Sequence, residues 1–171
     1  MSYEKIKLIV LDVDGTMTDG GVYIDNGRLE SKRFHIKDGA GILLAQSIGI
    51  QFLFLTGRKS ECVHQRAEEL NIRFVQQGIM EKAGFLEKFM LEQELQSEEV
   101  AYCGDDLNDL KAMRLAGLRA CPADAAFEVK ACCELILNTM GGQGAVRELV
   151  ELLLKGRNEW EKAMEIQFGI S

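Results

Sequence analysis

Short apolar runs alternate with longer polar and helix-forming segments along most of this chain. The clearest runs end abruptly in carboxylates, threonine or glycine, and they are Leu8–Leu11, Ile50–Leu55 and Val100–Cys103. A near-continuous aliphatic run of this length is typical of a parallel strand that is buried on both faces. Because helix-like segments follow these runs, the pattern predicts an α/β fold with a Rossmann-like, doubly wound parallel sheet.

The other segments extend this alternation to the end of the chain. Further short strands are expected at Arg73–Val75, Leu118–Ala120 and Leu135–Leu137. Helices are expected at Asp38–Ser47, Lys59–Leu70, Met80–Leu95, Leu107–Ala116, Ala125–Ala131 and Gly144–Leu154. In the tail from Lys155 to Ser171, Trp160, Met164 and Ile166 form a short apolar stripe, which predicts a docked or frayed C-terminal helix.

A β-hairpin is predicted directly after the first strand. Val22–Ile24 and Leu29–Phe34 have strand character, and Asp25-Asn26-Gly27-Arg28 separates them. Asn-Gly between two strand-like segments is a strong short-range signal for a hairpin turn. The hairpin should therefore project from the end of the first strand, beside Asp14.

The composition predicts one ordinary globular domain. The chain has 171 residues, of which 47% are hydrophobic and 27% charged, and a single proline gives no sign of a linker. We therefore expect one domain over 1–171, with the hairpin at about 20–35 and the tail at about 155–171. No apolar stretch approaches the roughly 20 residues that span a membrane, and 1–7 lack a signal-peptide core, so no membrane contact and a cytoplasmic location are expected.

Cysteine usage and net charge narrow the classes of partner. The five cysteines show no metal-ligand spacing, so neither a zinc site nor a structural disulfide is expected. A formal net charge of -7 argues against binding of nucleic acid. An acidic protein can still hold an anionic substrate where local cations and a metal ion reverse the field.

Carboxylates at the strand ends carry the candidate chemistry. Asp12 and Asp14 end the first run and Asp105 follows the run Val100–Cys103, so all three should converge at the carboxyl edge of the sheet. Asp12 is the candidate nucleophile toward phosphorus, and Asp14 the candidate general acid and then general base. Oxygen ligands from Asp12, Asp105 and a backbone carbonyl near Asp14 suit Mg²⁺.

Two further positions fit the handling of a phosphate group. Thr56 ends the second strand, and Gly57 lets the backbone approach a ligand, so both can donate hydrogen bonds to phosphate oxygens. Lys82, near the start of a predicted helix, can add a positive charge. Taken singly, a Thr-Gly after a strand is usually just the entry to a helix, and a lone lysine on a helix is usually solvated.

In combination, these segments resemble the four motifs of the haloacid dehalogenase (HAD) superfamily. The matching motifs, in chain order, are Asp12-Val13-Asp14-Gly15-Thr16, Thr56-Gly57, Lys82 and Gly104–Asp109. The resemblance implies phosphoryl transfer through an aspartyl-phosphate on Asp12, with Thr56 and Lys82 completing the catalytic set and Mg²⁺ held by Asp12, the Asp14 carbonyl and Asp105. It also implies supporting roles around the metal ion for Asp106, Asn108 and Asp109.

The spacing leaves no room for a cap domain, which larger members of the superfamily insert around the second motif. The chain therefore resembles the capless sugar-acid phosphatases, in which neighbouring subunits of a homotetramer complete the site. This implies a small sugar-acid phosphate substrate, most simply an eight-carbon 2-keto-3-deoxy acid used in lipopolysaccharide precursor synthesis. The hairpin would be the assembling element.

The same resemblance implies the residues that contact substrate. They are Asp14, His35, Ile36, Lys37, Asp38, Gly39, Thr56, Gly57, Arg58, Arg66 and Lys82. Arginine suits a carboxylate-bearing substrate because its guanidinium binds carboxylates as a fork. Arg58 and Arg66, two helical turns apart, are expected to line one wall, whereas His64 is expected to be solvated. His35 fits a substrate contact and a structural hydrogen bond equally well.

Alternatives remain open on the sequence. A phosphatase for a nine-carbon sialic-acid-type 9-phosphate would share most motifs, but those enzymes typically carry glutamate after Thr-Gly, where this chain has Arg58. A non-catalytic tetramerising module is the alternative of another class, and it need not retain the catalytic set. The glycines of 141–144 fit a phosphate cradle or a tight turn, and we place them outside the site.

Overall fold

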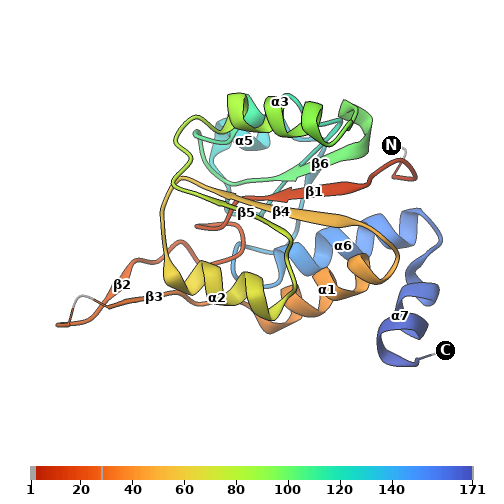
Figure 1. The fold of residues 1–171 in the computed structure, drawn as a ribbon, viewed down its shortest axis with the longest axis horizontal. Coiled ribbons are helices and arrows are strands. Elements are labelled where there is room, and N and C mark those ends of the chain that lie inside the picture. Colours follow the sequence, from red (N-terminus) through yellow and green to blue (C-terminus); the bar gives the residue numbers. More distant parts are fainter. Residues whose placement is uncertain (1–2, 28, 171) are drawn as a thin grey trace.

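Six parallel strands form the central sheet of the protein in a computed structural model that describes residues 3–27 and 29–170 (Figure 1). Their order across the sheet is β5-β4-β1-β6-β7-β8. The strands are β1 (Leu8–Leu11), β4 (Gln51–Thr56), β5 (Phe74–Gln77), β6 (Val100–Cys103), β7 (Leu118–Cys121) and β8 (Leu135–Ile136). β1 lies between β4 and β6, so the predicted doubly wound parallel sheet is confirmed.

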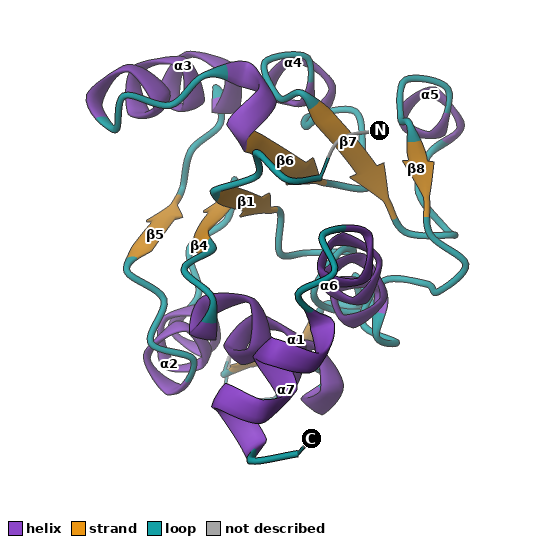
Figure 2. Cartoon of the chain, turned by 90° about the vertical axis from the view of Figure 1, so that its right-hand side faces the viewer, coloured by secondary structure: helices purple, strands orange, loops and turns teal. Residues whose placement is uncertain are grey.

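Helices cover both faces of this sheet (Figure 2). They are α1 (Ile36–Ser47), α2 (Glu61–Glu69), α3 (Lys82–Glu92), α4 (Leu110–Met113), α5 (Phe127–Lys130), α6 (Ala145–Gly156) and α7 (Trp160–Phe168), with a short 3₁₀ turn at Ser97–Glu99. α3, α4 and α5 pack on one face, and α1, α2, α6 and α7 lie on the other. Between β1 and β4 the described residues form a hairpin and α1 and no cap domain.

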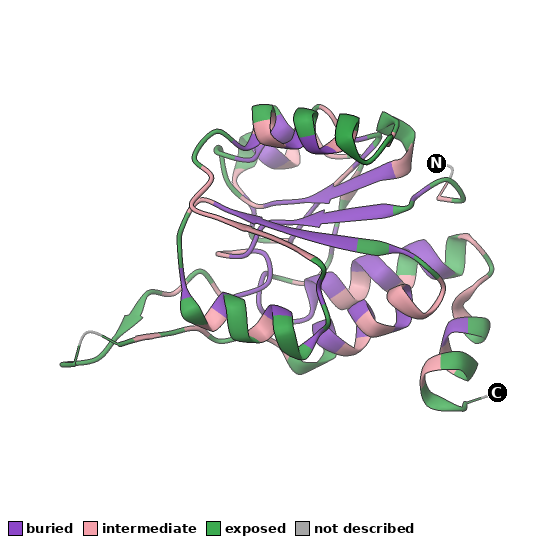
Figure 3. Cartoon of the chain, viewed as in Figure 1, coloured by how far each residue is buried: buried purple, intermediate pink, exposed green. Residues whose placement is uncertain are grey.

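The alternation of side chains along the strands divides the core into two layers. Leu8 and Val10 pack toward α3 and α4, whereas Ile9 and Leu11 pack toward α1 and α6. All four are buried, and β1, β4 and β6 form the buried centre of the molecule (Figure 3). Both layers therefore hold β1 in place, which fixes the position of the residues that follow it.

The projecting hairpin is present, with shorter strands than expected. β2 (Tyr23–Ile24) and β3 (Glu30–Ser31) pair antiparallel, with Tyr23 opposite Ser31 and Ile24 opposite Glu30 (Figure 1). The Asn-Gly step lies in the connection between β2 and β3, of which Arg28 lies outside the described residues. The Asp25 carboxylate closes this loop by accepting a 2.8 Å hydrogen bond from the Leu29 N–H.

The predicted helices are present, but their boundaries differ from those observed, by several residues in α1, α3 and α4. α1 begins at Ile36 rather than at Asp38, and α3 covers Lys82–Glu92 rather than Met80–Leu95. The Glu81 side chain accepts the Gly84 N–H at 2.6 Å and so caps the start of α3. Most of the predicted helix Leu107–Ala116 is loop, and only α4 is helical.

The C-terminal segment ends in a docked helix, as expected, but its apolar stripe is partly wrong. Ala163 of α7 is buried, and Trp160 and Met164 pack against the core. Ile166 is 56% exposed and does not belong to this face. The packed positions are related by three and four residues, which places them on one side of a helix.

No helix in 3–27 or 29–170 is both long and apolar enough to cross a membrane.

Candidate active site

A cavity of about 180 Å³ opens at the carboxyl end of the sheet. It lies where β1, β4 and β6 end, which is the position at which doubly wound sheets bind their ligands. Its lining residues are Asp12, Asp14, Thr56, Gly57, Arg58, Asp105, Asp106 and Asn108. The sequence predicted this convergence of residues that are far apart along the chain.

Asp12 follows β1 and is almost completely buried. Its N–H donates to the Cys103 carbonyl at 3.0 Å, which continues the pairing of β1 with β6 by one residue. The residue is 4% exposed, and Lys82 Nζ donates to Asp12 Oδ1 at 2.6 Å. Burial raises the pKa of Asp12 well above its ordinary value, nearby Asp109 raises it further, and Lys82 acts in the opposite direction.

Lys82 is the first residue of α3, and its ammonium lies between two carboxylates. It also donates to Asp109 Oδ1 at 2.7 Å. Asp109 is fully buried and accepts three more hydrogen bonds, from Tyr102 Oη at 2.8 Å and from the N–H groups of Asp105 and Asp106 at 3.2 and 3.4 Å. The carboxylate of Asp109 is thus satisfied away from the cavity and holds Lys82 against Asp12.

Asp105 lies directly opposite the turn that follows Asp12. Thr16 Oγ1 donates to Asp105 Oδ1 at 2.9 Å, and burial raises the pKa of Asp105 to about 6. Gly15 has φ +94°, and a Cβ at this position would lie 2.1 Å from Asp105 Oδ2. Glycine is therefore required at Gly15 for the turn and for the close approach of Asp105.

The carboxylates fit a divalent cation. One oxygen from each of Asp12, Asp105 and Asp109 lies within 4.8 Å of the others. Asp109 already accepts four hydrogen bonds, whereas Asp12 and Asp105 line the cavity. Burial raises the pKa of both Asp12 and Asp105, so a bound cation would favour their charged forms. Oxygen donors of this kind are those that Mg²⁺ prefers.

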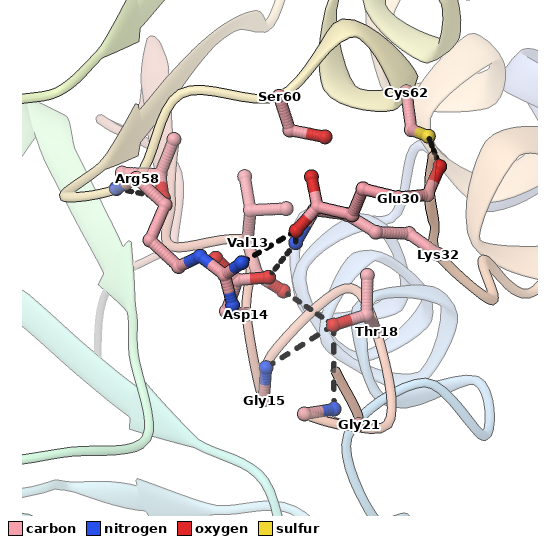
Figure 4. A network of polar contacts seen from close by, with 12 residues as sticks. Val13, Asp14, Gly15, Thr18, Gly21, Glu30, Lys32, Arg58, Ser60 and Cys62 are labelled. Carbon is pink, nitrogen blue, oxygen red and sulfur yellow. Dashed lines mark hydrogen bonds and ion pairs between the residues drawn. The ribbon is translucent and has the colours of Figure 1, made fainter. Parts of the chain in front are cut away.

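Asp14 stands at the cavity wall in a separate network of charges (Figure 4). Lys32, just after β3, donates to Asp14 Oδ1, and its ammonium also lies 3.5 Å from Glu30 Oε1. Arg58 Nη2 donates to the same Glu30 oxygen at 2.5 Å. The hairpin therefore contributes charged side chains that pair with two residues of the cavity wall, Asp14 and Arg58.

Other predicted substrate residues do not reach the cavity of their own chain. The segment His35–Gly39 lies at the start of α1, where Ile36 is 77% exposed and Asp38 is buried. Asp38 Oδ1 accepts the Arg147 N–H at 2.8 Å at the beginning of α6, and His35 Nδ1 is buried without a hydrogen-bond partner. His35 and Asp38 thus lie against the start of α6, whereas Ile36 and Lys37 are exposed and Gly39 packs against Arg66 of α2.

The expected wall formed by Arg58 and Arg66 is wrong for a single chain. α2 begins at Glu61, so Arg58 lies in the bend before the helix. Arg58 and Arg66 therefore do not share one helix face two turns apart. Arg66 donates to Glu69 Oε2 at 3.0 Å, and its guanidinium lies 6.0 Å from the Phe34 ring centre. It lines a different hollow, between the hairpin and α2. His64 is 54% exposed and lies 3.3 Å from Glu68, as a solvated residue should.

The structure places two further groups of residues relative to the cavity: the acidic segment 106–109 and the glycines of 141–144. Asp106 and Asn108 line the cavity directly, whereas Asp109 lies behind it. The glycine cluster packs on the backbone of the Asp12 turn, because a Cβ at Gly141 would lie 1.8 Å from the Gly15 carbonyl oxygen. This confirms that the cluster is a close-packed turn, outside the cavity lining.

Sequence reasoning missed three residues that hold this site together. Lys32, Thr16 and Tyr102 each bond to one of the candidate carboxylates. Tyr102 carried a detectable signal, because a hydroxyl within a strand that is buried on both faces needs a hydrogen-bond partner. Lys32 carried none, since a lysine after a hairpin strand is ordinarily solvated.

Comparisons with known proteins identify the family. No family model matches the chain. It is 36% identical to the 3-deoxy-D-manno-octulosonate 8-phosphate phosphatase KdsC of Escherichia coli strain K12, over 94% of this chain and 85% of that protein. A chain from Legionella pneumophila described as a HAD superfamily (subfamily III A) hydrolase superposes with a TM-score of 0.92 at 36% identity, covering 95% of this chain and 90% of that one.

A second solved structure shows the ligands of a relative. The Moraxella catarrhalis 3-deoxy-D-manno-octulosonate 8-phosphate phosphatase, in complex with magnesium, phosphate and KDO, superposes with a TM-score of 0.91 at 36% identity. The match covers 94% of this chain and 92% of that one. These similarities extend over nearly the whole chain and include the strands that carry the cavity. The chain therefore belongs to the 3-deoxy-D-manno-octulosonate 8-phosphate phosphatase family of the HAD superfamily.

Proposed function

We propose that this protein is a Mg²⁺-dependent phosphatase that hydrolyses 3-deoxy-D-manno-octulosonate 8-phosphate to the free sugar acid and phosphate, a step that serves lipopolysaccharide precursor synthesis. The observation that carries the proposal is the cavity where β1, β4 and β6 end, with Asp12 and Asp105 facing one another beside Asp14. Relatives with this activity match 94% of the chain. The presence of these residues supports an active enzyme over a module that keeps only the fold.

In the first half of the reaction, Asp12 is the nucleophile. One carboxylate oxygen of Asp12 forms a bond to phosphorus while the bond from phosphorus to the sugar oxygen breaks. Asp14 gives its proton to the departing sugar oxygen, which leaves as an alcohol. Thr56 and Gly57 line the cavity, and the Thr56 hydroxyl and the Gly57 N–H would bind phosphate oxygens.

In the second half, water releases the phosphate. Asp14, now a carboxylate, takes a proton from water as the water oxygen bonds to phosphorus. The bond between phosphorus and the Asp12 oxygen breaks, which restores the Asp12 carboxylate and frees inorganic phosphate. Lys82 stays paired to Asp12 and offsets part of the negative charge at this position.

Asp12, Asp105 and the Asp14 carbonyl would hold Mg²⁺. When bound, the ion neutralises part of the repulsion between the phosphate and the carboxylates. Asp109 supports this set from behind, through Lys82 and the N–H groups of Asp105 and Asp106.

The carboxylate of the substrate has a natural partner in Arg58. Arg58 lines the cavity and is paired with Glu30, so a substrate carboxylate would compete with Glu30 for the guanidinium. Arg58→Ala is expected to raise KM for the sugar-acid phosphate by about 10–100-fold, the value of one charged hydrogen-bonded contact. Hydrolysis of p-nitrophenyl phosphate, which has no carboxylate, should change by less than about 3-fold.

Steady-state kinetics on both substrates check this assignment. Arg73→Ala is the matched control, because Arg73 stacks on Phe74 at the start of β5, at the opposite edge of the sheet from the cavity. Equal losses of kcat/KM on the two substrates would place Arg58 on the phosphate instead.

Phosphate release from a panel of sugar phosphates, with and without Mg²⁺, tests the function itself. Preference for the eight-carbon 2-keto-3-deoxy acid is the expected result. Preference for a nine-carbon acid would keep the mechanism and reassign the substrate. Inactivity on every member by a folded, Mg²⁺-binding protein would instead support the assembly-module alternative. The cytoplasmic location stays a prediction, which cell fractionation can check.

We further propose that the protein assembles as a homotetramer through the hairpin. Val22, Ile24 and Leu29 of the hairpin are 57%, 64% and 69% exposed. An isolated two-stranded ribbon with such side chains is marginally stable in water, and contact with other subunits would bury them. Neighbouring subunits would then bring Arg66 and His35–Gly39 toward a cavity that these residues do not reach in their own chain.

The variant Ile24→Asp is expected to dissociate the tetramer, because it places a charge in the apolar contact. Sedimentation velocity at micromolar concentration measures the change, and KM for the sugar acid should rise with dissociation. Leu91→Asp is the matched control, since Leu91 of α3 is 79% exposed and distant in sequence from the hairpin. A parent protein that sediments as a monomer would exclude this assembly.

A further inference from the structure

Lys32 is an unusual residue for a hairpin strand because its side chain is only 2% exposed. Burial of a lysine is costly unless its charge is compensated. Two carboxylates compensate it: Asp14 accepts directly from Lys32 Nζ, and Glu30 Oε1 lies 3.5 Å away (Figure 4). The lysine is therefore held in one place and is not a mobile surface charge.

The network around Lys32 alternates in sign and is anchored to α2 at Glu30. Its members in order are Asp14, Lys32, Glu30 and Arg58, joined by successive ion pairs. The backbone carbonyl of Glu30 also accepts from Cys62 Sγ of α2 at 3.3 Å. The position of Lys32 is thus fixed from the hairpin and from α2 together.

Asp14 depends on this anchor. Within 3–27 and 29–170, Lys32 is the side chain that bonds to the Asp14 carboxylate. Asp12, by contrast, is held by Lys82, which comes from the other face of the sheet. Each of the two carboxylates of the Asp-Val-Asp motif is therefore oriented by its own buried lysine.

We propose that Lys32 is a positioning residue that holds the Asp14 carboxylate at the cavity wall, in the orientation from which it exchanges a proton with the leaving group and with water. The proposal rests on the proposed function and adds to it a role for the hairpin. The hairpin then serves the chemistry of its own subunit as well as assembly. Loss of the contact should lower kcat, because a shift of about 1 Å in a reacting group can cost 10²-fold in rate.

The variant Lys32→Met tests this, since methionine fills similar space without the charge. The expected result is a fall in kcat of about 10–100-fold on the sugar-acid phosphate, with KM changed by less than about 3-fold. Lys32→Arg should recover part of the rate, because it restores a cation near Asp14. Arg33→Met is the matched control, because the Arg33 side chain is 56% exposed and lies 3.9 Å from Asp19. The kcat of this variant should therefore stay within about 2-fold of the parent value.

A double-mutant cycle separates positioning from a general structural effect. If Lys32 acts through Asp14, Lys32→Met should cause no further loss in an Asp14→Ala background. The proposal would be overturned if the loss of kcat in the double variant were the product of the two single losses. An unchanged kcat in Lys32→Met would overturn it as well. Thermal unfolding and the Mg²⁺-induced rise in Tm verify that each variant is folded. If Lys32→Met does not fold, Lys32→Gln enters the same cycle with the same expected results.

Failure of the proposed role of Lys32 can be distinguished from failure of the proposed function. A parent protein that releases phosphate while Lys32→Met matches it in kcat overturns only the role of Lys32. A parent protein that binds Mg²⁺ but hydrolyses no phosphate ester overturns the proposed function, and the role of Lys32 with it.

Discussion

Replacing Asp12 with asparagine is expected to abolish turnover while leaving the fold intact. The substitution is nearly isosteric but removes the oxygen nucleophile, so kcat should fall by at least about four orders of magnitude. Asparagine keeps an acceptor for Lys82 Nζ, which donates to Asp12 Oδ1 in the parent protein. Phosphate release under saturating substrate and Mg²⁺ measures the loss. Turnover close to that of the parent, in protein whose asparagine is verified by mass spectrometry, would point to another nucleophile.

The same variant makes a prediction about stability. In the metal-free fold, burial raises the pKa of Asp12, so the folded state binds a proton more tightly than the unfolded state does. Such a group lowers stability as pH rises from its ordinary pKa through its folded one. The asparagine of Asp12→Asn carries no charge, so at pH 7 without Mg²⁺ the variant should unfold at the same temperature as the parent or above it. Asp25→Asn, in the exposed hairpin loop, is the matched control and should leave both Tm and kcat unchanged.

Elements of the fold were predictable from the sequence where a short run of neighbouring residues determines them. All side chains of the aliphatic run Leu8–Leu11 are buried only if helices cover both faces of its sheet. The structure buries them in two layers. The helix expected at Leu107–Ala116 failed because Asp109 uses its carboxylate to bind the N–H groups of Asp105 and Asp106. These bonds fold the start of the segment into a loop, and a helical pattern of apolar positions does not reveal them.

The candidate site was predictable to the extent that topology dictates it. Asp12, Thr56 and Asp105 converge because parallel strands end at one edge of the sheet. The direction in which a loop or helix points its side chains was not predictable in the same way. Arg66 turns toward Phe34 and the hairpin, and Lys32 turns inward to Asp14. Both depend on how the hairpin packs on α2, for which the spacing of residues along the chain gives no rule.

Replacing Lys82 with methionine is expected to give the largest loss of stability. Lys82 is 2% exposed and pairs with Asp12 and Asp109 at 2.6 and 2.7 Å. Burial lowers the pKa of Lys82, but the two carboxylates outweigh burial and raise the pKa above its ordinary value. A lysine with a raised pKa contributes its full stabilisation at every pH below its unfolded pKa, so the contribution is complete at pH 7. Methionine removes it and should cost about 3–5 kcal/mol, the usual result of stranding a buried charge.

The pH dependence of this loss identifies its cause. Without Lys82, Asp12 and Asp109 are two buried carboxylates with no cation between them, so protonation of Asp12 relieves the repulsion. The deficit relative to the parent, measured by denaturant unfolding without Mg²⁺, should therefore be largest at about pH 7–8 and shrink toward about pH 5. Mg²⁺ should recover part of it by binding beside Asp12. Lys88→Met is the matched control on α3, because Lys88 is 77% exposed and lies 3.6 Å from Glu92. A deficit that is the same at both ends of this pH range would show that lost packing, and not the charge of Lys82, is what the fold requires.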